Sequence, residues 1–138
     1  SITLHERARK GKRTCNEILG YDLSGTDSFT INPKEAEYVN YVHDQYIVRK
    51  SLTEVTALAK EKGFHGKRGQ EPTSWAIFKI LTCPVYAGYN SFKGKLYKGN
   101  HEPIRTVQQY NKVQKILIRQ GKLTGRNRKY KIRIIPEK

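Results

Sequence analysis

Apolar residues recur every three or four positions in four segments of this chain, which predicts four amphipathic helices. The last segment shows the clearest stripe, formed by Val107, Tyr110, Val113 and Leu117. In the third segment the apolar residues cover more than one face, so we expect that helix to be well buried for its length. Trp75, in particular, is expected to hold it against the core. The predicted helices span residues 32–48, 51–62, 73–82 and 106–120.

The ends of these segments carry residues typical of helix boundaries. Asn32 can cap the first helix, and Glu35 stands at the capping-box position three residues later. Ser51 opens a second segment with the same signature, and Thr73 caps the third. Pro84 ends the third helix because a proline disfavours helical backbone in the residue before it. Local chemistry therefore predicts where each helix starts and stops.

Turn-rich stretches predict two short β-hairpins beside the helices. Residues 19–23 and 29–31 would form strands around a Ser-Gly-Thr-Asp turn. Residues 85–92 are strand-like, and the segment 92–97 looks like a hairpin tip carrying lysines. Apolar and basic residues alternate over 130–134, which favours either a strand or a linker. The predicted fold class is α+β, mainly helical, with small β-hairpins.

The charge of the chain is its strongest compositional feature. The 138 residues carry a formal net charge of +15, and the sequence pI is about 9.9. Glu102 is the only acidic residue between Pro72 and Pro136, whereas lysines and arginines recur throughout that stretch. Such an asymmetry favours a polyanionic partner, with nucleic acid ahead of an anionic membrane surface or a merely solvated basic face.

No apolar run approaches the roughly 20 residues needed to cross a bilayer, and the first residues lack the apolar stretch of a signal peptide. We therefore expect a cytoplasmic protein with no membrane partner.

The order of the predicted elements resembles a helix-turn-helix with a wing. Two capped helices, 51–62 and 73–82, are joined by a basic loop with glycines, and a lysine-tipped hairpin follows them. The loop is longer than in the tightest version of this motif, so two ordinary core helices remain the alternative. In the DNA-binding reading, the second helix presents its N-terminal end to a groove, where free N–H groups and the helix dipole favour phosphate.

Candidate DNA contacts follow from this arrangement. Gln70 suits bidentate adenine readout, while Lys67 and Arg68 suit phosphate or guanine. A basic arm at the N-terminus can lie in a minor groove, although it can also be a terminus that only adds charge. The predicted DNA-binding residues are Arg7, Arg9, Lys10, Lys12, Arg13, Lys67, Arg68, Gln70, Thr73, Ser74, Lys79, Lys93, Lys95 and Lys98.

Nothing in the sequence marks a catalytic or metal site. The four histidines form no HxH or HxxxH pair, and no phosphate-binding glycine motif is present. Cys15 and Cys83 are too few for a four-ligand zinc site, and Cys83 is expected to be a small buried residue near a helix end. We expect no cofactor, no metal and no enzymatic activity in these residues.

Several stretches together resemble the recombinase DNA-binding domain of the large serine recombinases, the group of phage integrases and transposon recombinases. The strongest is a helix ending in Pro-x-Tyr-x-Gly, where Cys83 stands in place of the family's usual asparagine. The resemblance covers roughly residues 6–120. The stretches are ARKGKRTCNEILGYDL, INPKEAEYVNYVHDQYI, SLTEVTALAKEKGF, SWAIFKILTCPVYAGY and HEPIRTVQQYNKVQKIL.

This resemblance implies a domain organisation. Residues 1–14 would be a basic linker arm from a missing catalytic domain, 15–121 the DNA-binding domain, and 122–138 a basic tail toward a missing zinc ribbon. The serine nucleophile would lie in the missing domain, so this part would recognise an attachment half-site in double-stranded DNA without cutting it. The full-length protein is expected to act as a dimer or tetramer on DNA.

Two other functions stay open on the sequence alone. A basic RNA-binding domain would use the nine tyrosines to stack unpaired bases. A protein-interaction module would use the apolar face of residues 107–117 for dimerisation. A preference for single-stranded RNA over duplex DNA would favour the first function. Self-association without affinity for nucleic acid would favour the second.

Overall fold

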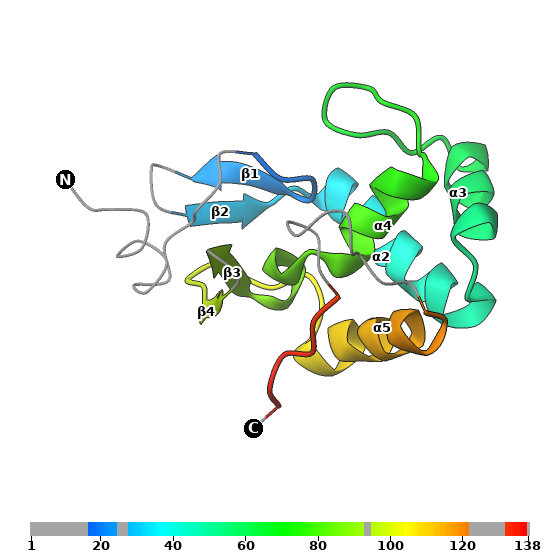
Figure 1. Ribbon diagram of the computed structural model, residues 1–138. Helices are drawn as coiled ribbons and strands as arrows, with labels where there is room; N and C mark the ends of the chain where they lie inside the picture. The colour runs from blue at the N-terminus through cyan, green and yellow to red at the C-terminus, as the bar shows by residue number, and fades with distance from the viewer. Residues whose placement is uncertain (1–16, 25–27, 93–94, 122–131, 138) are drawn as a thin grey trace.

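The computed structural model describes residues 17–24, 28–92, 95–121 and 132–137. Over these ranges the chain forms helices that pack together, with two antiparallel hairpins on the side opposite α3 (Figure 1). The helices are α2 (Pro33–Arg49), α3 (Leu52–Glu61), α4 (Ser74–Thr82) and α5 (Val107–Arg119), with the 3-10 helix η1 (Pro84–Ala87). The strands are β1 (Tyr21–Ser24), β2 (Ser28–Ile31), β3 (Tyr89–Phe92) and β4 (Lys95–Lys98).

All four predicted helices are present, and the three N-terminal caps predicted from the sequence form as expected. Asn32, Ser51 and Thr73 each accept a hydrogen bond from the backbone N–H three residues later, at 3.0–3.2 Å. The reciprocal half of the predicted capping box at Asn32 is missing, because the Asn32 N–H donates to the carbonyl of Gly20 instead. Both reciprocal bonds of a capping box form only at Thr106, within the part of the chain described here.

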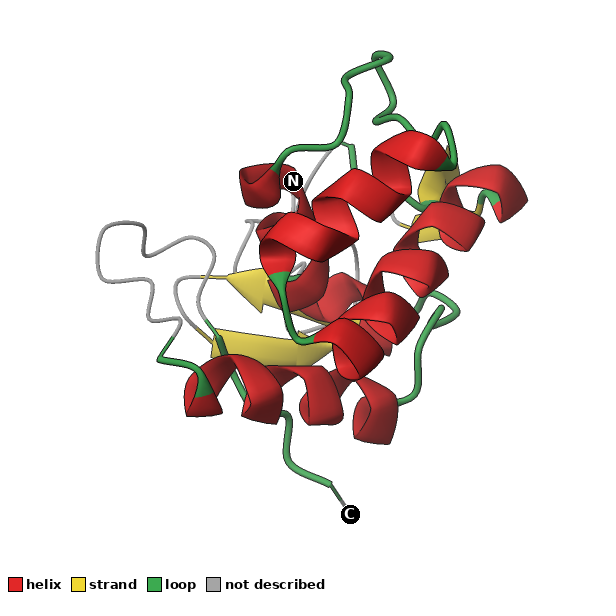
Figure 2. Ribbon diagram, turned by 90° about the vertical axis from the view of Figure 1, so that its right-hand side faces the viewer, coloured by secondary structure: helices red, strands yellow, loops and turns green. Residues whose placement is uncertain are grey.

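Helix α2 organises the core, since α3, α4 and α5 all pack against it. Figure 2 shows the packed helices from the side on which α3 lies in Figure 1. Val39, Val42 and Tyr46 of α2 are fully buried, and so are Leu81 of α4 and Leu117 of α5. Helix α3 packs on α4, and the hairpin β3–β4 follows α4 after η1. The predicted helix-turn-helix-like arrangement with a hairpin after it is therefore confirmed.

The expected strand over residues 85–92 is wrong in its first half. Pro84 starts the 3-10 helix η1, which ends at Ala87 and is capped by Gly88 with a φ of +90°, and the strand β3 begins only at Tyr89. The backbone carbonyl of Tyr86 accepts hydrogen bonds from the N–H groups of residues 104 and 105, at 2.9 and 2.8 Å. Contacts to a distant segment thus stabilise a tight turn where the local pattern favours a strand.

The tail over residues 132–137 is not a strand. Ile135 is fully buried, while Ile134 is 41 % exposed, so the apolar alternation does not match the burial. The side-chain amide of Asn111 on α5 donates to the Ile135 carbonyl and accepts from the Ile135 N–H, both at 2.8 Å. These two hydrogen bonds attach the tail to α5 and take the place of a strand partner.

A candidate nucleic-acid interface at helix α4

The C-terminal end of α4 is closed by side chains from two other helices. Its last carbonyl groups lack intrahelical partners because Pro84 stops the helix. His43 Nε2 lies 3.2 Å from the carbonyl of residue 80, Gln114 Nε2 donates to that of residue 81 at 2.6 Å, and the Tyr110 hydroxyl donates to that of residue 82 at 2.8 Å. The C-terminal end is thus buried, and the N-terminal end of α4 faces outward.

His43 serves this arrangement in its neutral form. Burial, and then the nearby guanidinium of Arg105, lowers the pKa of His43 to about 3. A neutral imidazole that bonds a carbonyl through Nε2 must carry its hydrogen there. Arg105 is itself buried and pairs with Asp44 at 2.9 Å.

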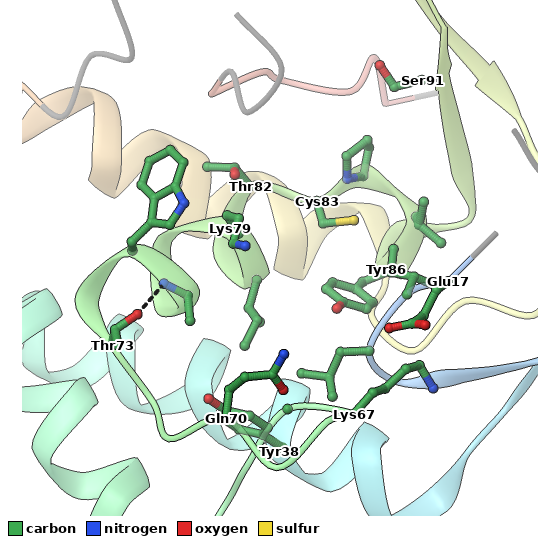
Figure 3. A pocket seen from close by; sticks show the side chains of 18 of the residues that line it. Glu17, Tyr38, Lys67, Gln70, Thr73, Lys79, Thr82, Cys83, Tyr86 and Ser91 are labelled. Atoms are coloured by element: carbon green, nitrogen blue, oxygen red, sulfur yellow. Dashed lines mark hydrogen bonds between the residues drawn. The ribbon is translucent and has the colours of Figure 1, made fainter. Parts of the chain in front are cut away.

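The N-terminal end of α4 carries two exposed hydroxyl side chains. The Thr73 hydroxyl accepts from the N–H of Ala76 at 3.0 Å as the helix cap (Figure 3). Ser74 Oγ lies 3.5 Å from Thr56 Oγ1, and the Thr56 hydroxyl donates to the Leu52 carbonyl at 2.6 Å. This chain of contacts holds the start of α4 against α3 while both hydroxyls stay at the surface.

The solvent-facing side of α4 borders a groove of about 760 Å³. Ala76 and Lys79 lie on this side, and Cys83 follows at the helix end, half-buried rather than fully buried as expected. The loop before α4 forms another wall, with Lys67 and Gln70 seen below Lys79 in Figure 3. The groove therefore brings together Lys67, Gln70, Thr73 and Lys79, four of the predicted DNA contacts.

Trp75 differs from the sequence-based expectation. The residue is 46 % exposed, although its ring stacks on Phe78 at 6.0 Å between centroids and an interplanar angle of 17°. Phe78 of this pair is buried, whereas Trp75 lies at the surface, and Ile77 and Leu81 are the fully buried residues that fix the helix. Periodicity alone could not separate these roles, since apolar residues occur on more than one face of α4.

The loop before α4 closes on itself around Gln70. The Gly66 N–H donates to the Gln70 carbonyl at 2.9 Å, and Gln70 Oε1 accepts from the N–H of Arg68 at 2.9 Å. The Gln70 side chain is exposed, and its oxygen already helps to shape the loop. The Arg68 side chain is 76 % exposed, and its Nη2 lies 3.5 Å from Glu17 Oε2.

Lys67 is mostly buried, unlike its neighbour Arg68. Its ammonium group bonds Glu35 Oε1 at 2.6 Å and the Tyr21 carbonyl at 2.7 Å, and its side chain is only 20 % exposed. Glu35 Oε1 also accepts from the Gly20 N–H at 3.0 Å, which explains why it does not complete the predicted capping box. In this structure Lys67 ties the loop to β1 and to the start of α2.

The remaining predicted contacts lie elsewhere. Lys95 and Lys98 are exposed at the two ends of β4, and neither of them lines the groove. Lys93 and all five basic residues of the N-terminal arm lie outside the described residues. The arm residues concerned are Arg7, Arg9, Lys10, Lys12 and Arg13.

The structure adds one basic residue that the sequence did not suggest. Arg133 lines the groove, and its Nη2 donates to Ser91 Oγ of β3 at 2.9 Å. Its position depends on the attachment of the tail to α5 through Asn111, and no local pattern around Arg133 signals that contact. Within the described ranges, no group of three or more His, Cys, Asp or Glu residues could hold a metal ion, and no helix is long and apolar enough to span a membrane.

A short capped helix with an exposed N-terminal end, packed on a preceding helix and followed by a hairpin, defines a helix-turn-helix-like domain. The Recombinase family model matches residues 33–120, which is more than half of the chain. The chain therefore belongs to the Recombinase family, as the resemblance of its motifs implied.

Two solved structures are similar to the chain. A chain of an LSR–DNA complex shares 30 % sequence identity, with a TM-score of 0.75, over 88 % of this chain and 38 % of that one. A structure from work on the sequence requirements of the Listeria innocua prophage attP site shares 31 % identity, with a TM-score of 0.75, over 86 % of this chain and 50 % of that one. This chain thus spans half or less of either. No curated protein matches it.

Proposed function

We propose that this chain is the duplex DNA-binding domain of a site-specific serine recombinase and that it recognises an attachment half-site. The observation that carries the proposal is its likeness to a chain of an LSR–DNA complex, at 30 % identity over 88 % of its length. The similar structure concerned with a prophage attP site supports an attachment site as the target. The net charge of +15 supplies the sequence-independent attraction to phosphate.

The exposed N-terminal end of α4 meets the DNA in this proposal. Its free N–H groups and the hydroxyls of Thr73 and Ser74 contact phosphates or base edges, and Lys79 contacts the backbone along the same helix. Arg68 and Gln70 read bases from the loop. Lys93, Lys95 and Lys98 of the second hairpin and the basic arm add phosphate contacts. Lys67 joins them only if it leaves its pairing with Glu35.

The family resemblance also bears on the whole protein. The serine nucleophile belongs to a separate domain in that family, so we expect this chain alone to bind DNA without cleaving it. We further propose that the full-length protein acts as a dimer or tetramer on its site, with one such domain on each half-site.

Selection from a random pool of duplex DNA at near-physiological salt tests the proposal. An enriched motif is the expected result and would define half of an attachment site. Binding that is salt-sensitive but selects no motif would limit the domain to gripping the backbone, and absence of duplex binding would refute the proposal. A nicking assay on the selected duplex checks that no strand is cut.

The structure gives no support to the two alternative functions. Of the eight described tyrosines, five are buried and the others half-buried, so they offer no exposed stacking platform for RNA bases. The apolar face of α5 packs inside the domain, since Tyr110, Val113 and Leu117 are fully buried. That face is therefore not available for dimerisation in the folded chain.

A further inference from the structure

A buried side chain of α5 holds the tail over residues 132–137 to the domain. Asn111 is 1 % exposed, and its amide exchanges two hydrogen bonds with the backbone of Ile135, each at 2.8 Å. The Ile135 side chain is fully buried in a cluster with Ala87 and Tyr110. The asparagine therefore bonds the tail at one residue as a neighbouring β-strand would.

This attachment confines Arg133, which stands two residues before Ile135. Two residues span at most about 7 Å, so the fixed backbone of Ile135 limits the positions that Arg133 can reach. Arg133 Nη2 donates to Ser91 Oγ of β3 at 2.9 Å, and the residue lines the groove together with Lys79 of α4. Ser91 and Lys79 are both labelled at this groove in Figure 3. Contacts with α5 and with β3 thus hold Arg133 at the groove.

Arg133 decides the charge balance of the groove. Among the described residues that line it, three are basic and two are acidic, so without Arg133 the two signs would be equal. Ser91 is a neutral acceptor, and its hydrogen bond orients the guanidinium without adding a negative charge. The tail therefore supplies the net positive charge of the groove. The charged residues of the lining are Glu17, Lys67, Glu71, Lys79 and Arg133.

We propose that Arg133 contacts a phosphate group of the DNA backbone at this groove and that Asn111 is the positioning residue that holds it there. The inference rests on the proposed DNA-binding function and adds the tail to the interface around α4. A guanidinium presents a planar set of donors that matches phosphate oxygens. A guanidinium that is already oriented also loses less conformational entropy when it binds.

The phosphate contact is tested with Arg133→Gln, which removes the charge and keeps a side chain that can hydrogen-bond Ser91. Fluorescence anisotropy measures the affinity of the 138-residue chain for the selected duplex over a series of salt concentrations. Loss of one phosphate contact should make the slope of log K against log salt concentration shallower by about 0.9. Arg119→Gln, at an exposed position of α5 outside the groove lining, is the matched control and should leave the slope nearly unchanged.

The positioning role is tested with Asn111→Ala. If Asn111 acts through Arg133, this variant should shift the slope by the same amount, and the double variant with Arg133→Gln should shift it no further. A residue that only stabilises the fold would lower the urea midpoint and leave the slope of the folded protein unchanged. Should Asn111→Ala not fold, Ile135→Ser releases the tail without altering α5 and should give the same slope as Arg133→Gln.

Three results would contradict the inference. An unchanged slope in Arg133→Gln would exclude the phosphate contact. A wild-type slope in a folded Asn111→Ala or Ile135→Ser variant, or additive shifts in the double variant, would exclude the positioning role. Absence of duplex binding by the unmodified chain would instead refute the proposed function.

Discussion

Gln114 of α5 donates a hydrogen bond from its side-chain amide to the backbone carbonyl of Leu81 in α4, at 2.6 Å, and both residues are fully buried. This bond satisfies a carbonyl at the helix C-terminus that would otherwise have no partner. Together with His43 and Tyr110, it sets which end of α4 is buried and which end is exposed.

Replacing Gln114 by Met should therefore destabilise the domain with little change in packed volume. The Leu81 carbonyl would remain buried without its donor, a loss of about 1–3 kcal/mol. Urea unfolding followed by circular dichroism measures the effect. Gln108→Met, at an exposed position of the same helix, is the control and should leave the midpoint nearly unchanged.

The domain should lose stability below about pH 6.5 because His43 resists protonation when folded. Its folded pKa is about 3, whereas an unperturbed histidine has a pKa near 6.5. The unfolded chain thus binds more protons between these values, and stability falls as pH falls. Through this effect His43 lowers the free energy of unfolding by about 2 kcal/mol between pH 7 and pH 5.

Urea midpoints at pH 7 and pH 5, compared with those of His43→Gln, isolate this contribution. Glutamine can still donate to the carbonyl of residue 80 but does not titrate. His101, whose pKa burial also lowers, acts in the same direction and is present in both proteins. An equal pH dependence in the two proteins would contradict the assignment to His43.

Lys67 should matter for folding more than for DNA affinity. Lys67→Met removes an ammonium group that bonds both Glu35 and the Tyr21 carbonyl and leaves the Glu35 carboxylate half-buried. We expect a loss of about 1 kcal/mol or more in the free energy of unfolding. A variant with unchanged stability and strongly reduced DNA binding would show that Lys67 contacts DNA instead.

Arg68 and Gln70 should matter more for DNA affinity than for folding, because both side chains are exposed. Arg68→Ala and Gln70→Ala are expected to weaken binding to the selected motif by about 1–3 kcal/mol each, and to weaken non-specific binding less. Competition assays with motif and scrambled duplexes measure the ratio of specific to non-specific affinity for each variant. Equal losses on both duplexes would remove these residues from base readout.

The N-terminal arm should act mainly through salt-dependent attraction. Deleting residues 1–13 removes five basic residues, and each phosphate contact contributes about 0.9 to the slope of log K against log salt concentration. The deletion should make the slope shallower while the selected motif stays the same. An unchanged slope would mean that the arm does not contact DNA.

The limits of the sequence are clearest at Glu35 and Trp75. Spacing predicted a capping box for Glu35, but Lys67, 32 residues away, bonds its carboxylate. Spacing also predicted a buried Trp75, but the four packed helices leave that face of α4 outside. For Glu35 the local pattern left open which group its carboxylate bonds, and for Trp75 it left open whether the ring is buried or exposed. Contacts between residues distant in sequence decided both questions.

The sequence by itself determined the helices, their caps, the two hairpins and the basic character of the chain. These features depend on residues within one or two turns of each other, which propensity, capping and turn chemistry report directly. Even the family resemblance depended on the order of such local motifs.

Only the tertiary structure decided which end of α4 is buried and which end is exposed. The orientation of α4 depends on hydrogen bonds from His43, Tyr110 and Gln114, which lie 28 to 37 residues from their partners along the chain. Buried carbonyls must find donors, and only the packing of α2 and α5 against α4 brings these donors within reach.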